Sequence, residues 1–204
     1  MLLPAIDALL RRAGVEVAAL GAFAVGVGPG SFTGLRVGIA TVKGLAFGSG
    51  ARVAAVGTLA ALALRAPRTR DPIVAVLDAR RGEVYAASFR RDGEELEPAD
   101  LPEGLYTPED LASRLPPRCI LVGDGVAVCG DRLREALGSG VRCVAPPRGR
   151  PRAREVGALG LAMISRGEEI DAAGLVPRYV RRAEAEVRRT GQATELAPRG
   201  RSLQ

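Results

Sequence analysis

The amino-acid sequence predicts an α/β fold. Short apolar runs typical of buried strands alternate along the chain with longer segments whose apolar residues recur at helical spacing. Alternation of strands and helices is characteristic of α/β domains. The 204 residues suffice for one or two compact domains, and 47% of them are apolar although only 3% are aromatic. The cores are therefore expected to consist mainly of Ala, Val and Leu.

The chain is predicted to begin with a helix for which Gly14 is the C-cap. Its apolar residues at helical spacing are Leu2, Leu3, Ile6, Leu9 and Leu10. A Gly28-Pro29-Gly30 turn follows the first strand, and Ser31 or Thr33 is the expected N-cap of the next helix. The predicted elements of this part are strand 22–27, helix 32–47, strand 52–56 and helix 59–64.

The charged, proline-containing stretch 65–72 is a candidate boundary, and a second α/β segment follows it. Strands 73–78 and 83–90 are expected to form a β-hairpin. Thr107 is the predicted N-cap of the next helix, with Pro108 at its first position. The remaining predicted elements are helix 108–115, strand 120–122, helix 126–137, strand 142–145 and helix 152–167. Residues beyond Thr190 are expected to be disordered.

The glycine-rich turn and the helix after it are the most informative part of the sequence. A glycine inside a helix costs about 1 kcal/mol relative to alanine, yet Gly34, Gly38 and Gly44 all fall inside the predicted helix. Three interpretations are open. The turn and the helix N-terminus could bind a phosphate, the glycines could allow close packing on the chain's own sheet, or they could admit a partner helix. In the first interpretation, the residues that would bind the phosphate are Gly28, Gly30, Ser31 and Thr33.

Several classes of site are disfavoured by composition. The chain has no histidine, which excludes a Ser-His-Asp triad and any histidine-based metal site. Its three cysteines are widely spaced, so neither a zinc site nor a disulfide framework is expected, and we predict no metal. No apolar run is long enough to cross a bilayer, and the N-terminus lacks the pattern of a signal peptide. We therefore expect a cytoplasmic protein that does not contact membranes.

The chain is basic, with a net charge of +6 and a pI near 10. Lys43 is the one lysine, so the positive charge comes from arginine. Arg148, Arg150, Arg152 and Arg154 form a basic run that suits either a solvated linker or a contact with phosphates or an acidic partner. No aromatic residues are interleaved with these arginines, which weakens the prediction of direct RNA binding.

Six motifs follow one another along nearly the whole chain: GPGSFTGLRVGIATVKGLAFG at 28–48, VAAVGTLAALA at 53–63, VLDARRGEVYA at 76–86, LVGDG at 121–125, VPRYVR at 176–181 and AEVR at 185–188. In this order they resemble the TsaB (YeaZ) family of bacterial tRNA-modification proteins. The resemblance implies a two-lobe actin/Hsp70-like (RNase H-like) fold. It divides the chain into a first lobe at 1–68, a second at 69–189 and a disordered tail at 190–204. Family members usually carry additional strands before the first helix, so the first lobe is expected to be N-terminally truncated. A start codon assigned too late and a natural fragment both account for this, and the late start is favoured, because the remaining lobe cannot bury its sheet alone.

The resemblance also implies a function. TsaB-like proteins are non-catalytic subunits that support the TsaD enzyme, with the ATPase TsaE, in adding threonylcarbamoyl to the tRNA adenosine next to the anticodon. Contact with tRNA is expected through the complex, and homodimers could compete with the heterodimer. No cofactor is expected, with nucleotide binding weak or lost. The residues predicted to dock on TsaD are Leu3, Ile6, Leu10, Gly34, Leu35, Gly38, Ile39 and Val42. Gly38→Leu is predicted to abolish this docking.

Two alternatives belong to other functional classes. One is an actin-like ATPase or sugar-kinase-type phosphotransferase, in which the Gly28–Thr33 turn binds phosphate and Asp78 or Asp124 acts as base or magnesium ligand. Asp78, with Arg80, Arg81, Glu83 and Tyr85 after it, better suits a hairpin held by charge pairs with a tyrosine on one face, so no catalytic role is assigned. The other alternative is a basic module that binds RNA on its own, with a steep salt dependence.

Overall fold

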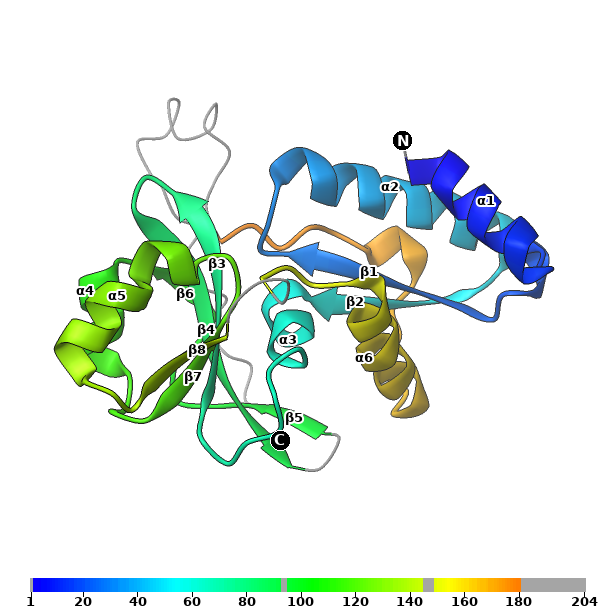
Figure 1. Ribbon diagram of the computed structural model, residues 1–204. Helices are drawn as coiled ribbons and strands as arrows, with labels where there is room; N and C mark the ends of the chain where they lie inside the picture. The colour runs from blue at the N-terminus through cyan, green and yellow to red at the C-terminus, as the bar shows by residue number, and fades with distance from the viewer. Residues whose placement is uncertain (1, 93–94, 145–148, 181–204) are drawn as a thin grey trace. The chain divides into compact units, whose positions relative to one another are not determined.

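A computed structural model describes residues 2–92, 95–144 and 149–180, and it confirms the predicted α/β class (Figure 1). The chain forms two compact units. Of the described residues, unit 1 comprises 2–61 and 151–178, and unit 2 comprises 62–92, 95–144, 149–150 and 179–180. A linear division near residue 68 would place residues 151–178 in the second lobe, whereas the structure packs them on the strands of the first. The expected tail at 190–204 lies outside the described residues.

Unit 1 is built on two parallel strands, β1 (Ala22–Gly28) and β2 (Arg52–Gly57). Ala22 is in register with Arg52, and Gly26 with Val56. Within the described residues β1 pairs with β2 alone, while the far edge of β2 forms a single bridge between Val53 and Ile170.

A helix covers each face of this small sheet. On one face, α2 (Phe32–Ser49) buries Ile39, Val42 and Ala46 against Val25 and Val27 of β1. On the other, α6 (Ala153–Ser165) packs against both strands. Because side chains alternate across a strand, the valines of β1 face α2 and its alanines face α6. The bulkier residues are thus on the α2 side, and α6 approaches the strands more closely.

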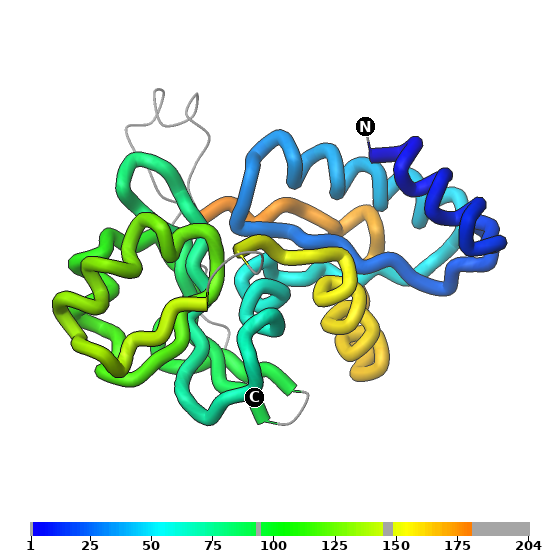
Figure 2. Tube along the Cα trace, viewed as in Figure 1, coloured from blue at the N-terminus to red at the C-terminus, as the bar shows by residue number. Residues whose placement is uncertain are grey.

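The segment after α6, residues 166–178, packs against the strands and α2 of unit 1 (Figure 2). It forms a short 3₁₀ helix, η2 (Ala172–Gly174), and buries Leu175 in the core beneath α2. The backbone N–H of Arg178 then donates to the carbonyl oxygen of Val27 at 2.7 Å. Residues far apart in the sequence therefore meet at the end of β1.

Three further elements lie in the first 63 residues. Helix α1 (Leu2–Ala13) buries none of its residues, and Gly14 follows it with a φ of +66°. A 3₁₀ turn, η1 (Val17–Ala19), leads into β1. Helix α3 (Thr58–Ala63) follows β2 directly.

Unit 2 is a mixed sheet in the order β5-β4-β3-β7-β8, with β6 also paired to β4. The predicted hairpin is confirmed as the antiparallel pair β3–β4, and β3, β7 and β8 run parallel. Strands β5 and β6 are not among the elements expected from the sequence. The strand bounds are β3 (Ile73–Arg80), β4 (Glu83–Asp92), β5 (Glu95–Pro98), β6 (Gly104–Tyr106), β7 (Cys119–Val122) and β8 (Val141–Val144).

Two helices pack on the core of this sheet, α4 (Pro108–Arg114) and α5 (Val126–Leu137). Leu111 and Leu133 are fully buried there, among valines of β3 and β4. Thr107 caps α4 as predicted, because its hydroxyl accepts from Asp110 N–H and the Asp110 carboxylate accepts from Thr107 N–H.

Candidate functional site

Helices α1 and α2 expose apolar side chains that the core of unit 1 does not use. Leu3 and Leu9 of α1 are 56% and 65% exposed, and on α2 the corresponding values are 50% for Val37 and 92% for Phe47. An amphipathic helix normally turns its apolar stripe to a core. The stripe of α1 is left facing solvent, so these two helices present a candidate docking surface.

The α2 glycines are not explained by packing within the described chain. Apart from its chain neighbours and the backbone of α2 itself, a Cβ built on Gly44 or Gly48 would have no described atom within 4 Å, and one built on Gly34 would meet the Ser31 side chain at 3.4 Å. Gly160 of α6 is the contrasting case, since its missing side chain makes room for Ala24. The face of α2 that carries Gly44 and Gly48 is thus open to a partner.

The structure divides the predicted docking residues into two groups. Ile39 and Val42 are 5% and 9% exposed and contribute to the core of unit 1, so they hold α2 on its sheet rather than offer area to a partner. Gly38 is half-buried, with Val25 Cγ2 at 3.9 Å from a Cβ built there. The residues that remain accessible, fully or in part, are Leu3, Ile6, Leu10, Gly34 and Leu35. Periodicity identifies an apolar stripe but cannot tell which side of a two-sided helix faces the core.

The glycine turn is occupied by the chain itself. Gly28 has a φ of +126°, and a Cβ there would collide with the backbone carbonyl of Arg178. Ser31 is the N-cap of α2, since its Oγ accepts from Gly34 N–H at 3.3 Å. The close approach that Gly28 permits is therefore to Arg178, in the VPRYVR motif, and Gly30 and Thr33 are exposed.

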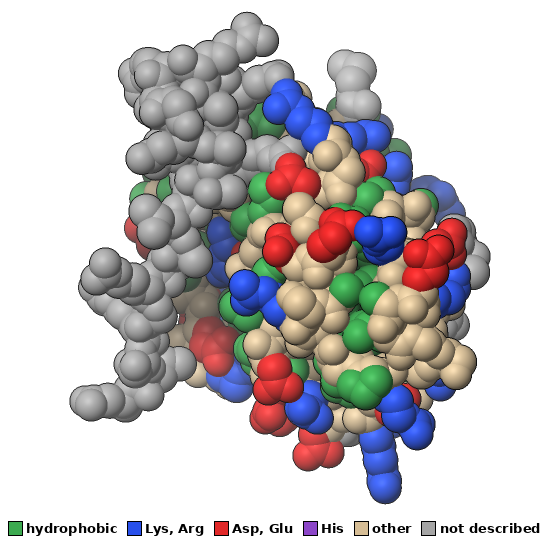
Figure 3. All heavy atoms as spheres, turned by 90° about the vertical axis from the view of Figure 1, so that its left-hand side faces the viewer, with side chains coloured by type: hydrophobic (Ala, Val, Ile, Leu, Met, Phe, Trp, Pro, Cys, Tyr) green, Lys and Arg blue, Asp and Glu red, His purple; other side chains and the backbone are tan. Residues whose placement is uncertain are grey.

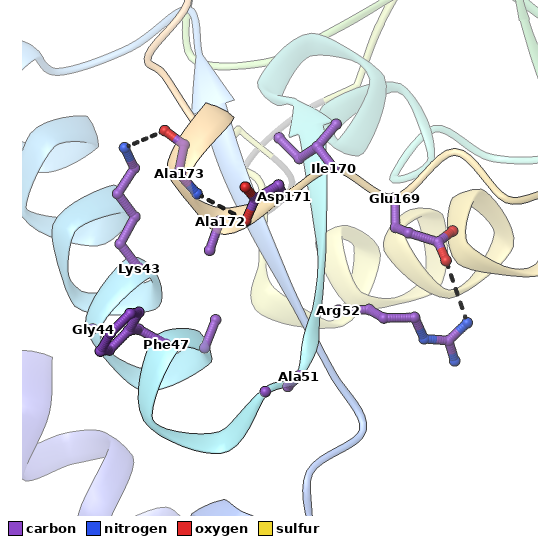
Figure 4. Close-up of a pocket in the computed structure, with 12 residues that line it drawn as sticks. Lys43, Gly44, Phe47, Ala51, Arg52, Glu169, Ile170, Asp171, Ala172 and Ala173 are labelled. Carbon is purple, nitrogen blue, oxygen red and sulfur yellow. Dashed lines mark hydrogen bonds and ion pairs between the residues drawn. The ribbon is translucent and has the colours of Figure 1, made fainter.

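A groove of about 900 Å³ lies between the C-terminal half of α2 and residues 169–173 (Figure 4). Lys43 Nζ donates to the carbonyl oxygen of Ala173 at 3.0 Å and ties the two walls together. An Arg52–Glu169 ion pair of 3.7 Å lies at one side, and Phe47 lines the groove from α2. The sequence did not indicate this groove, because its walls are more than a hundred residues apart.

The β3–β4 hairpin matches the structural interpretation of the DARRGEVY motif. Asp78 Oδ1 accepts from Arg80 N–H at 2.7 Å, and the Arg80 guanidinium lies 3.3 Å from the same carboxylate. Asp124 Oδ1 in turn accepts from Asp78 N–H at 3.0 Å. Arg80 and Arg81 both have positive φ, 67° and 59°. Both aspartates therefore stabilise the same turn, Asp78 by accepting from Arg80 and Asp124 by accepting from Asp78.

The Gly123-Asp124-Gly125 segment is a tight connection from β7 to α5. Gly123 has a φ of +135°, and a Cβ there would overlap the carbonyl of Val76. The described residues contain no group of three or more Cys, Asp or Glu placed to hold a metal ion. The glycine turn belongs to unit 1, whereas Asp78 and Asp124 belong to unit 2.

The three cysteines are free thiols in or beside the core of unit 2. Burial raises the pKa of Cys119 to about 11 and that of Cys129 to about 12, and the neighbouring Cys143 thiol adds to both shifts. Burial also raises the pKa of Cys143. At neutral pH all three are protonated and weakly nucleophilic.

In the basic run, Arg150 pairs with Asp124 at 3.6 Å, Arg152 precedes α6 and Arg154 lies in it, while Arg148 falls outside the described residues. No helix among the described residues is both long and apolar enough to span a membrane.

Comparisons with known proteins agree with this architecture. Residues 1–188 match the family model described as TsaD, tRNA N6-adenosine threonylcarbamoyltransferase. The tRNA threonylcarbamoyladenosine biosynthesis protein TsaB of Bacillus subtilis is 29% identical over 91% of this chain and 80% of its own length. TsaB of Escherichia coli is 36% identical over 56% of this chain, and the match spans half of the E. coli protein. The solved structure of YeaZ from Pseudomonas aeruginosa is 34% identical and superposes with a TM-score of 0.76 over 87% of this chain and 82% of that one.

The fold is accordingly the expected α/β fold of the actin-like (RNase H-like) class. The chain belongs to the family of the TsaD model and, within it, to the TsaB (YeaZ) proteins.

Proposed function

We propose that this protein is a non-catalytic subunit in the synthesis of threonylcarbamoyladenosine in tRNA. In this role it binds and supports a TsaD-type enzyme that modifies the adenosine next to the anticodon. The pathway is supported by the names of the TsaB relatives from B. subtilis and E. coli. The absence of histidine supports a subunit without acid–base chemistry of its own.

The observation that carries the proposal is the open glycine face of α2. Each helix glycine costs about 1 kcal/mol relative to alanine, and no described residue outside α2 comes within 4 Å of a Cβ built on Gly44 or Gly48. A partner helix that packs there gains close backbone contact, and the exposed Val37 and Phe47 add apolar area. Leu3 and Leu9 add exposed apolar area on α1.

The proposal also covers the partners, the cofactor and the compartment of the protein. A TsaE-type ATPase joins the complex, tRNA is contacted through the complex, and a homodimer competes for the same helices. The protein needs no cofactor and acts in the cytoplasm.

The test is co-elution of the full chain with the TsaD-type protein of the same organism. Gly44→Leu should abolish co-elution, because it fills the space left for the partner. This variant is preferable to Gly38→Leu, because Gly38 borders Val25 in the core and its replacement could unfold the sheet. Gly157→Leu on α6 is the matched control, since a Cβ there also has nothing within 4 Å.

The proposal fails if the parent chain does not co-elute, or if Gly44→Leu binds as tightly as the parent and Gly157→Leu. ATP turnover by the isolated chain would instead favour the ATPase or sugar-kinase alternative. No contact in the described residues favours that alternative, since the approach to Gly28 is made by Arg178.

A further inference from the structure

Small residues form most of the lining of the groove between the C-terminal half of α2 and residues 169–173 (Figure 4). The groove measures about 900 Å³, and every residue that lines it belongs to unit 1. Folded chains normally fill such spaces with their own side chains. Here the walls leave room for large side chains that the described chain does not supply. The small lining residues are Gly44, Ala46, Gly50, Ala51, Ala172 and Ala173.

The charged side chains of the groove are engaged with the groove's own groups. Lys43 Nζ donates to the carbonyl oxygen of Ala173 at 3.0 Å, and Asp171 Oδ1 accepts from Ala173 N–H at 3.2 Å. Arg52 pairs with Glu169 Oε1 at 3.7 Å, and the second carboxylate oxygen of Glu169 is buried, so a ligand in the groove does not reach it. The two positive and two negative side chains balance. The groove therefore suits an apolar occupant better than a charged one.

The groove opens onto the exposed face of α2. Gly44 and Phe47 line it, and the same two residues are exposed on the face of the helix that also carries Gly48. Phe47 is 92% exposed and stands at the edge of the groove. A partner helix that packs against Gly44 therefore passes over the mouth of the groove. An amphipathic helix that docks in this way inserts its regularly spaced apolar side chains into the groove.

The exposed surface of α2 differs in charge from the face of unit 2 that carries α4 and α5. On that face basic and acidic side chains are interspersed (Figure 3), and exposed pairs join Arg132 to Glu109 and Arg134 to Asp131. Of the exposed residues of α2, a helix that is described over its full length, Arg36 alone is charged. Charged residues are depleted at the centres of protein interfaces. The surface next to the groove thus has the composition of an interface centre.

We propose that the groove receives a large apolar side chain, leucine, methionine or phenylalanine, from a helix of the TsaD-type partner. The inference rests on the proposed function, since it names the contact that this partner makes beside Gly44. Large side chains that fill desolvated pockets near the centre of an interface contribute most of the binding free energy. Lys43 ties the two walls together without a partner. The groove is therefore formed before the partner binds, which lowers the free-energy cost of binding.

Filling the groove from two different walls tests the proposal. Ala173→Leu fills it from the segment after α6, and Ala51→Leu fills it from the residue before β2. Ala158→Leu is the matched control, since Ala158 is an exposed alanine of α6 that does not line the groove. In a titration with the TsaD-type protein, both groove variants should bind at least about tenfold more weakly than the control. The melting temperature of each isolated variant checks that the chain is folded.

A cysteine in the groove gives a second measurement with little change in side-chain volume. The three native thiols lie in or beside the core of unit 2 and are protonated, so N-ethylmaleimide should label Ala173→Cys before them. Binding of the TsaD-type protein should abolish this labelling, whereas Ala158→Cys should be labelled at the same rate with and without the partner. The parent chain gives the background from Cys143, the least buried native thiol.

The inference is overturned, and the proposed function stands, if the parent binds the partner and both leucine variants of the groove bind as tightly as Ala158→Leu. Labelling of Ala173→Cys that continues in the complex at the rate of the free chain has the same consequence. A loss of the homodimer alone, with binding to the TsaD-type protein unchanged, also overturns the inference, because the occupant would then be a second copy of this chain. A parent chain that does not bind the TsaD-type protein removes the proposed function and the inference together.

Discussion

Gly160 of α6 lies directly against Ala24 of β1, with no room for a side chain between the helix and the strand. It is part of the packing of α6 on β1 and β2, although more than a hundred residues separate Gly160 from Ala24 in sequence. It also explains why β1 has alanine where α6 covers it and valine where α2 does.

Gly160→Ala should therefore destabilise unit 1. The added methyl would collide with Ala24, and overpacking of this kind costs about 1–3 kcal/mol. Gly157→Ala on the same helix should be neutral or stabilising by up to about 1 kcal/mol, since that position is open. Thermal unfolding of the two variants checks this. Equal melting temperatures would contradict the close packing.

Gly28→Ala should destabilise the protein, and Gly30→Ala should not. Gly28 combines a φ of +126° with the Arg178 carbonyl at the place of a side chain, whereas a Cβ on Gly30 meets nothing within 4 Å. A strained backbone residue costs about 1–3 kcal/mol. Hydrogen exchange at the Arg178 amide, which donates to Val27, is the local measurement. It should become faster in the Gly28 variant only.

Asp78→Ala should loosen the β3–β4 hairpin more than Asp78→Asn does. The alanine variant leaves the Arg80 N–H without its acceptor, and the asparagine variant retains an oxygen at that place. A hydrogen bond to a charged group contributes about 1.5–3 kcal/mol. Hydrogen exchange at the Arg80 amide reports the difference. If both variants exchange like the parent, Asp78 does not position the turn.

Stability should fall as the pH rises from about 9 to 11. The ordinary thiol pKa is 9.0, and burial raises it to about 11 for Cys119 and about 12 for Cys129. Unfolded thiols therefore lose protons first, the folded state binds more protons, and the free energy of unfolding decreases with pH in this window. Melting curves at pH 8 and pH 10.5 should differ less for Cys119→Ala/Cys129→Ala than for the parent. An identical pH dependence in the two proteins would contradict the shifted thiols.

Much of the local structure could be predicted from the sequence because its causes are local. The predicted helix 126–137 has the observed bounds, and Thr107 is the cap expected from its position before an apolar helical segment. The sequence left Ser31 and Thr33 as alternative caps of α2, and the structure shows Ser31. The hairpin after Asp78 follows from two apolar runs that flank a turn. Strands β5 and β6 were missed because they are short and lack a strong alternating apolar pattern.

The docking surface could be predicted only in part. Helical periodicity showed that α1 has an apolar stripe and that α2 carries glycines. It could not show that Ile39 and Val42 face the chain's own sheet while Gly44 and Gly48 face open space. That distinction depends on which side of α2 the strands occupy.

The amino-acid sequence by itself determined most of the elements, the cap of α4 and the α/β class, since these follow from residues within a few positions of one another. The folded chain added the contacts between distant segments: Gly160 with Ala24, Arg178 with Val27, and Asp124 with the hairpin at Asp78. Such contacts depend on how strands and helices pack in three dimensions, and sequence spacing carries no record of that packing. They explain why the glycine turn is filled by the chain itself.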